Sequence, residues 1–92
     1  RENDLTVKGE TELWWRERLV TRMSSPIYQP RMYQDEKHVS FISGGSLHIT
    51  DNDGSNTYKP VNMGESDGYI FLSKGSTLVY ETGDKILALK IR

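Results

Sequence analysis

Few residues of this chain could do chemistry, and they lie far apart in the sequence. The two histidines are His38 and His48, and the 92 residues include no cysteine. A strand histidine such as His38 can act as a general base or as a lone metal ligand, but a structural role, hydrogen-bonded to a neighbour, is the commoner one. Metal sites need about three converging imidazole, thiolate or carboxylate ligands. We therefore expect no metal site and no other cofactor.

The motifs of the common catalytic classes are missing. The sequence has no phosphate-binding glycine loop, no serine with a histidine at a diagnostic spacing, and no carboxylate pair typical of glycosidases. The net charge of −1 gives no basic field for nucleic acid. No apolar run approaches the roughly 18 residues of a membrane span. We expect neither nucleic acid nor a membrane as a direct partner.

Aromatic side chains could line a ligand pocket. A cavity lined by tyrosines suits a small organic ligand, whereas the alternative is plain core filling with the hydroxyl groups at the rim. Four arginines could bind a carboxylate or phosphate, although the neighbouring Glu12 and Glu17 favour an ordinary charged surface. The candidate pocket residues are Tyr33, His38, Phe41, Tyr69, Phe71 and Tyr80, and the arginines are Arg16, Arg18, Arg22 and Arg31.

Trp14 and Trp15 are candidates for a protein interface. Adjacent residues of a strand point to opposite faces, so one ring can enter the core while the other faces solvent or a partner. Aromatic anchors concentrate binding energy in interfaces, and a chain of this size has only a modest core. We expect a homodimer that pairs through this edge. The alternative is a surface tryptophan that the N-terminal arm covers.

Short β-type runs between Gly-rich or Asn/Asp-rich turns predict an all-β fold of about eight antiparallel strands. Residues 11–23 alternate apolar and polar positions, which favours one strand over a competing helix. Further strands are expected at 27–33, with Pro30 at an edge or bulge, and at 38–50, with a kink or bulge at Gly44 and Gly45. A hairpin turn at 50–54 leads to a returning strand at 57–61.

The last third of the chain predicts three more strands. They cover 69–72, which is wholly apolar and is expected at the centre of the core, then 77–81 and 85–91. Residues 1–10 are polar and form an arm or an edge strand, and residues 11–92 form one β-barrel domain. The lack of cysteine fits an intracellular protein, cytoplasmic or nuclear. Arg1 in place of Met indicates a piece of a longer protein.

Several segments resemble the small cupins, particularly the ethanolamine-utilisation and ureidoglycine-aminohydrolase types. They are HVSFISGGSLHIT, TDNDG, DGYIFLSKG, and VYE followed by KILALKI. The resemblance implies a jelly-roll barrel and, in an enzyme, His38 and Glu81 as acid and base toward an amine or ureido-type metabolite. The histidine ligands of metal-binding cupins fall here on Arg31 and Tyr33, or on Met32 and Gln34, and on Leu78. The resemblance therefore brings no metal site.

The chain is also similar to the C-terminal cupin of centromere protein C, a kinetochore scaffold protein. The segment DGYIFLSKGSTLVYETGDKILALKIR has that domain's order of apolar strand, glycine turn, strand and apolar-basic tail. This second resemblance implies a structural dimerisation module. The sequence thus favours a metal-poor cupin domain that dimerises and binds a small ligand or a partner. A small-metabolite enzyme and a kinetochore-type scaffold domain are the alternatives.

Overall fold

Nine antiparallel strands form three sheets in the computed structural model, which describes residues 4–91. The first sheet contains β1 (Leu5–Lys8), β2 (Glu12–Trp15) and β3 (Arg18–Arg22). The second contains β4 (Tyr28–Met32), β5 (His38–Ser43) and β6 (Ser46–Asp51). The third contains β7 (Tyr69–Leu72), β8 (Thr77–Thr82) and β9 (Lys85–Lys90), with the 3₁₀ turn η2 (Ser73–Gly75) between β7 and β8. Each sheet is a meander of strands in sequence order.

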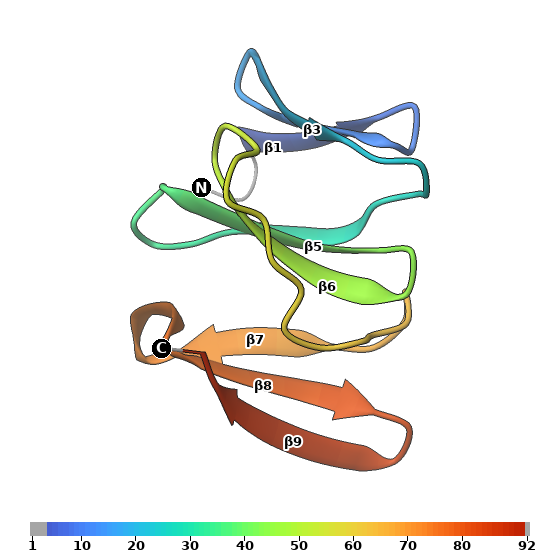
Figure 1. Ribbon diagram of the computed structural model, residues 1–92, viewed down its shortest axis with the longest axis vertical. Coiled ribbons are helices and arrows are strands. Elements are labelled where there is room, and N and C mark those ends of the chain that lie inside the picture. Colours follow the sequence, from blue (N-terminus) through green and yellow to red (C-terminus); the bar gives the residue numbers. More distant parts are fainter. Residues whose placement is uncertain (1–3, 92) are drawn as a thin grey trace.

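The expected all-β class is confirmed, but the sheets are arranged differently from the closed barrel that the sequence predicted. The sheets stack as three layers, with the second sheet in the middle (Figure 1). Within residues 4–91 they do not close into a barrel, so the expected jelly roll is not confirmed. No helix among these residues has the length and apolarity to cross a membrane.

The core is divided in two by the middle sheet. Val39 and Phe41 of β5 pack with Leu13 and Trp15 of the first sheet. Ile42 of β5 packs in a second cluster with Leu78 of the third sheet. Because successive strand residues point to opposite faces, β5 supplies both clusters, and nearly all of its residues are buried.

Polar groups inside this doubly covered hairpin all find hydrogen-bond partners. The Ser43 hydroxyl donates to the Ser25 carbonyl oxygen at 3.0 Å, and His48 Nε2 donates to the Ser43 carbonyl oxygen at 3.0 Å. The His48 ring also stacks on Phe41, with 4.9 Å between the ring centroids. His48 is thus a structural histidine, on the opposite face of the hairpin from His38.

Residues 11–23 are β structure, as the alternation predicted, but they form a hairpin and not one strand. The chain turns at Arg16 and Glu17, and Arg16 has a positive φ of 59°. Leu13 and Trp15, two apolar positions of this alternation, are buried. The register shifts between β2 and β3, so Val20 is buried and Leu19, which shares the parity of Leu13 and Trp15, is exposed.

The glycine pair at 44–45 is a turn, which corrects the expected kink in a continuous strand. Ser43 pairs with Ser46 across it, and the two glycines have φ values of 60° and 82°. Two consecutive positive φ angles match the right-handed twist of a tight β-hairpin. The chain therefore reverses here, and residues 38–50 form two paired strands.

Other expectations are met in part. The register of β4 shifts between Tyr28 and Arg31, and β4 is an edge strand, as Pro30 predicted. The arm at 1–10 contains the edge strand β1, while residues 1–3 lie outside the described range. The apolar run 69–72 was expected at the centre of the core, but only alternate residues of β7 face it. Ile70 and Leu72 point away from the core and are 48% and 47% exposed.

The segment 52–68 runs beside all three layers (Figure 1). It pairs with β6 through bridges at Tyr58 and Asn62, which is the expected return after the turn at 50–54. Met63 enters the second core cluster. Gly54 lies against β3, where an added Cβ would stand 2.0 Å from the Val20 carbonyl oxygen.

We expect Gly54→Ala to destabilise the fold strongly. Gly54 has a φ of 86°, and its Cβ would overlap backbone that cannot move without breaking β3. We expect a loss of about 2–4 kcal/mol in the free energy of unfolding, measured by urea denaturation. Gly9→Ala is the matched control, because Gly9 has a φ of 58° but no atom within 4 Å of an added Cβ. Equal losses in the two variants would contradict the proposed close packing.

Candidate functional site

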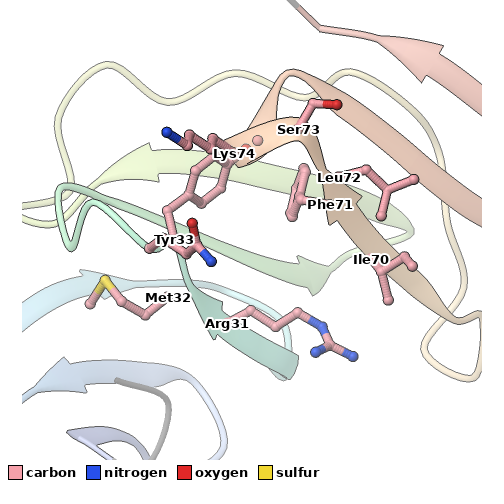
Figure 2. A pocket seen from close by; sticks show the side chains of 10 residues that line it. Arg31, Met32, Tyr33, Ile70, Phe71, Leu72, Ser73 and Lys74 are labelled. Atoms are coloured by element: carbon pink, nitrogen blue, oxygen red, sulfur yellow. The ribbon is translucent and has the colours of Figure 1, made fainter.

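The candidate functional site is a pocket of about 430 Å³ between the second and third sheets. The end of β4 and the residues after it form one wall, and β7 with η2 forms the other (Figure 2). Its lining residues are Arg31, Met32, Tyr33, Gln34, Ile70, Phe71, Leu72, Ser73, Lys74 and Gly75. The volume lies in the usual range for small-molecule sites.

Aromatic rings form the inner surface of the pocket. The ring centroids of Tyr33 and Phe71 lie 4.7 Å apart. The Tyr69 ring meets Phe71 edge-on, with 5.7 Å between the centroids. Tyr33 also packs on Gly75, where an added Cβ would come within 2.3 Å of the tyrosine ring. The absence of a side chain at Gly75 is therefore what allows Tyr33 to lie under the η2 turn.

The rim of the pocket is a strained turn. Ser73, Lys74 and Gly75 have φ values of 54°, 59° and 94°. Non-glycine residues rarely adopt the left-handed region, and strain of this kind clusters at functional sites. The turn is fixed by the hydrogen bond from the Ser76 N–H to the Ser73 carbonyl oxygen, 3.2 Å long. It presents the side chains of Ser73 and Lys74 at the mouth.

The charged residues that line the pocket are both cations. They are Arg31 and Lys74, and Figure 2 shows them at opposite ends, with Tyr33 and Phe71 between them. The guanidinium carbon of Arg31 lies 5.1 Å from the centre of the Tyr69 ring. A cation held over an aromatic face is attracted by the ring. The lining of the pocket thus combines two cationic side chains with aromatic walls.

Tyr69 fixes the two walls of the pocket relative to each other. Its hydroxyl donates to the Gln29 carbonyl oxygen at 2.7 Å and accepts a hydrogen bond from the Ser40 hydroxyl at 2.9 Å. Gln29 in turn donates through Nε2 to the Asp67 carbonyl oxygen. These bonds connect β4, β5 and β7, and they hold the Tyr69 ring over which Arg31 lies.

A second pocket of about 340 Å³ lies beside the first. Arg31 and Ile70 line both pockets and so form the ridge between them. The remaining lining residues of the second pocket are Gly68, Tyr69, Val79, Tyr80, Glu81 and Ile86. Glu81 is exposed here, at the end of β8.

His38 lies in a different, smaller pocket of about 170 Å³ with Tyr33, Ile49 and Tyr58. Its Nδ1 is 2.9 Å from Asp35 Oδ2, and its Nε2 is 3.5 Å from Asp51 Oδ1. Partial burial by itself would raise the Asp35 pKa. Hydrogen bonds from the Lys37 N–H and from His38 outweigh this effect, so the Asp35 pKa lies below its ordinary value. The arrangement is a hydrogen-bonded histidine between two carboxylates.

The residues expected in a single pocket are therefore divided among several places. Tyr33 and Phe71 line the main pocket, Tyr69 and Tyr80 line the second pocket, and His38 lies in the third. Phe41 lies in the first core cluster. Sequence reasoning did not single out Lys74 or Ser73, because the letters SKGS indicate only a turn.

The arginines outside the pocket follow the pattern of a charged surface. Arg22 pairs with Glu12 at 3.0 Å, and Arg16 lies over the Trp15 ring at 4.4 Å. Hydrogen bonds from Trp14 and from Arg22 hold the Glu12 pKa below its ordinary value. Trp15 is buried, and the half-buried Trp14 donates to Glu12 at 3.1 Å beneath the amino group of Lys8.

Among residues 4–91, no group of three or more histidine, cysteine or acidic side chains could hold a metal ion. Comparisons with known proteins add no assignment. No family model, curated protein or solved structure matches this chain. The site is therefore interpreted from its own geometry.

We expect Tyr69→Phe to lower the free energy of unfolding by about 1–3 kcal/mol, because Ser40 and Gln29 lose a buried partner. Urea denaturation measures the change. Tyr80→Phe is the matched control, since Tyr80 lies opposite Tyr69 in the sheet and its hydroxyl has no hydrogen-bond partner in the described chain. The control should stay within about 0.5 kcal/mol of the parent protein. A Tyr69→Phe variant as stable as the parent would contradict the role of this hydroxyl.

Proposed function

We propose that this domain binds a small anionic ligand with a flat apolar body in the pocket between β4 and η2. The observation that carries the proposal is the pair of cations, Arg31 and Lys74, around the packed rings of Tyr33 and Phe71. A carboxylate at one end of the ligand would meet Arg31 or Lys74. Its ring would lie along the aromatic wall.

The balance of charge favours an anion over a cation. The described lining of this pocket includes no acidic side chain, and Glu81 lines the neighbouring pocket. Arg31 is half-buried, so its charge is less screened by water than that of a surface arginine. Guanidinium groups bind carboxylates in a planar, bidentate geometry, which would orient the ligand.

A binding domain is favoured over the enzyme that the sequence left as an alternative. General acid–base catalysis requires the acid and the base to reach one substrate. His38 and Glu81, the candidate pair, line separate pockets. The kinship with the small cupins, and with the centromere protein C domain as a scaffold alternative, is proposed from the motifs at 38–54 and 67–92.

Benzoate and benzamide are matched probes for this pocket, because they share a ring and differ in charge. We expect benzoate to bind with a Kd on the order of 1 mM at low salt, and benzamide to bind at least about tenfold more weakly. Shifts of the Tyr33 and Phe71 ring signals in an NMR titration measure both affinities. Equal affinity for the two probes, or shifts confined to other residues, would overturn the proposal.

Two substitutions locate the anion. Lys74→Gln and Arg31→Gln should each weaken benzoate binding by at least about threefold, because each removes one of the two charges. Lys37→Gln is the control, since Lys37 is an exposed lysine outside the lining of this pocket. Benzoate binding that falls equally in all three variants would show a general charge effect and not a site.

A further inference from the structure

The last strand, β9, has a neighbour on one side only. It pairs with β8 and forms an edge of the third sheet (Figure 1). All six of its residues are exposed, although four of them are the apolar residues Ile86–Leu89. Exposed edges with apolar side chains are templates for pairing with another strand.

The backbone groups at this free edge can be assigned. The Ile91 N–H donates to the Ser76 carbonyl oxygen at 2.8 Å, so residue 91 directs its backbone groups toward β8. Direction alternates along an antiparallel strand. Leu87 and Leu89 therefore also point toward β8, and Ile86, Ala88 and Lys90 offer their N–H and C=O groups at the free edge.

The side chains around this edge are unusually apolar for a protein surface. Ile86, Leu87 and Leu89 are 71%, 41% and 37% exposed. Ile86 lies on the outer face of the sheet opposite Glu81, and Ala88, Val79 and Ile70 form the next row along the strand on the same face. Contiguous apolar surface of this kind marks interaction sites. Both faces of β9 would lose apolar area to water when a second strand is added.

We propose that β9 pairs antiparallel with β9 of a second copy of this chain, with the two-fold axis at Leu87. In this register Ile86 lies opposite Ala88 of the partner subunit, and both residues present their backbone groups at the free edge. Continued one residue beyond β9, the register brings Lys90 beside Asp84 of the partner subunit, in the turn between β8 and β9. The two third sheets then form one continuous six-stranded sheet.

Two constraints select this register: the alternating direction of the backbone groups along β9 and the charges at its ends. A strand that pairs with itself can place the axis only at a residue, because paired residues must share the same backbone direction. An axis at Ala88 would place Lys90 opposite Ile86, and an axis at Ile86 would place it opposite Thr82. With the axis at Leu87, each of the two Lys90 side chains in the dimer faces Asp84 of the other copy. Neither Asp84 nor Lys90 forms an ion pair within residues 4–91.

A second copy fits this edge because the edge is complementary to itself. On the inner face, Leu87 meets its own counterpart, and Leu89 lies opposite the methylene chain of Lys85. The apolar centre is thus flanked by opposite charges at both ends. This interface differs from the one expected at Trp14 and Trp15, whose rings are half-buried and buried within one chain.

Charge reversal tests the register. The protein should be a dimer by sedimentation velocity at micromolar concentration. Asp84→Lys and Lys90→Asp should each raise the dimer dissociation constant by about tenfold or more, because two attractive pairs become two repulsive ones. The double variant, which keeps the net charge, should recover the parent constant within about threefold. An equimolar mixture of the two single variants should form a heterodimer.

Ala88→Pro is the second, independent test. The Ala88 N–H points away from β8, so proline can occupy this edge position without breaking the hairpin. We expect a folded monomer, with circular dichroism as the check of folding. A parent protein that is monomeric throughout, or a dimer that tolerates both single charge reversals, would overturn the proposal. Benzoate binding is measured on the monomeric variant as well, so a failed dimer and a failed ligand site remain distinguishable.

Discussion

The hairpin of β5 and β6 must be buried on both faces, and the other elements are arranged to meet that requirement. Antiparallel sheets commonly keep one face in water, but here the first sheet covers one face of the hairpin and the third sheet covers the other. Because both faces of the hairpin are covered, its buried polar side chains cannot form hydrogen bonds with water and need partners within the protein. The Ser40 hydroxyl therefore bonds to Tyr69 of the third sheet, the Ser43 hydroxyl donates to the Ser25 carbonyl oxygen between β3 and β4, and the Thr50 hydroxyl donates to the Ser55 carbonyl oxygen just after β6.

The candidate pocket follows from that constraint. Ser40 bonds Tyr69, and Tyr69 bonds the carbonyl oxygen of Gln29, so the third sheet is held against the edge of the second. The edge itself is irregular at Pro30, where the register of β4 shifts. An irregular edge leaves space beside the sheet, and the η2 turn and Tyr33 form the walls of that space.

The sequence predicted the strands better than their packing. Period-two alternation correctly identified β structure over the helix at 11–23, and the Asn/Asp/Gly letters correctly marked the turn at 50–54. Gly44 and Gly45 fit both a kink and a turn locally, and only the pairing of Ser43 with Ser46 decides between them. The burial of Ile70 depends on whether another layer covers the third sheet, which no local pattern encodes.

The same limit applies to the site. Tyr33 and Phe71 could be selected as aromatic residues, but Lys74 reaches the pocket through three consecutive left-handed residues. Ser and Lys have no strong preference for that conformation, so their letters carry no signal for it. The position of the Lys74 charge at the pocket mouth therefore depends on a backbone conformation that the residue types of the turn do not predict.

Each sheet is built from one uninterrupted stretch of chain, and this has a consequence for how the protein forms. Within each sheet, every strand pairs with its neighbour in sequence through a short turn, and the segments between β3 and β4 and between β6 and β7 connect one sheet to the next. Loop closure costs little entropy when the joined strands are close in sequence, and low contact order speeds folding. Each meander can thus assemble as it leaves the ribosome. The middle hairpin stays half-covered until the third meander has been synthesised, and we expect the docking of the layers to be slower than the pairing of strands.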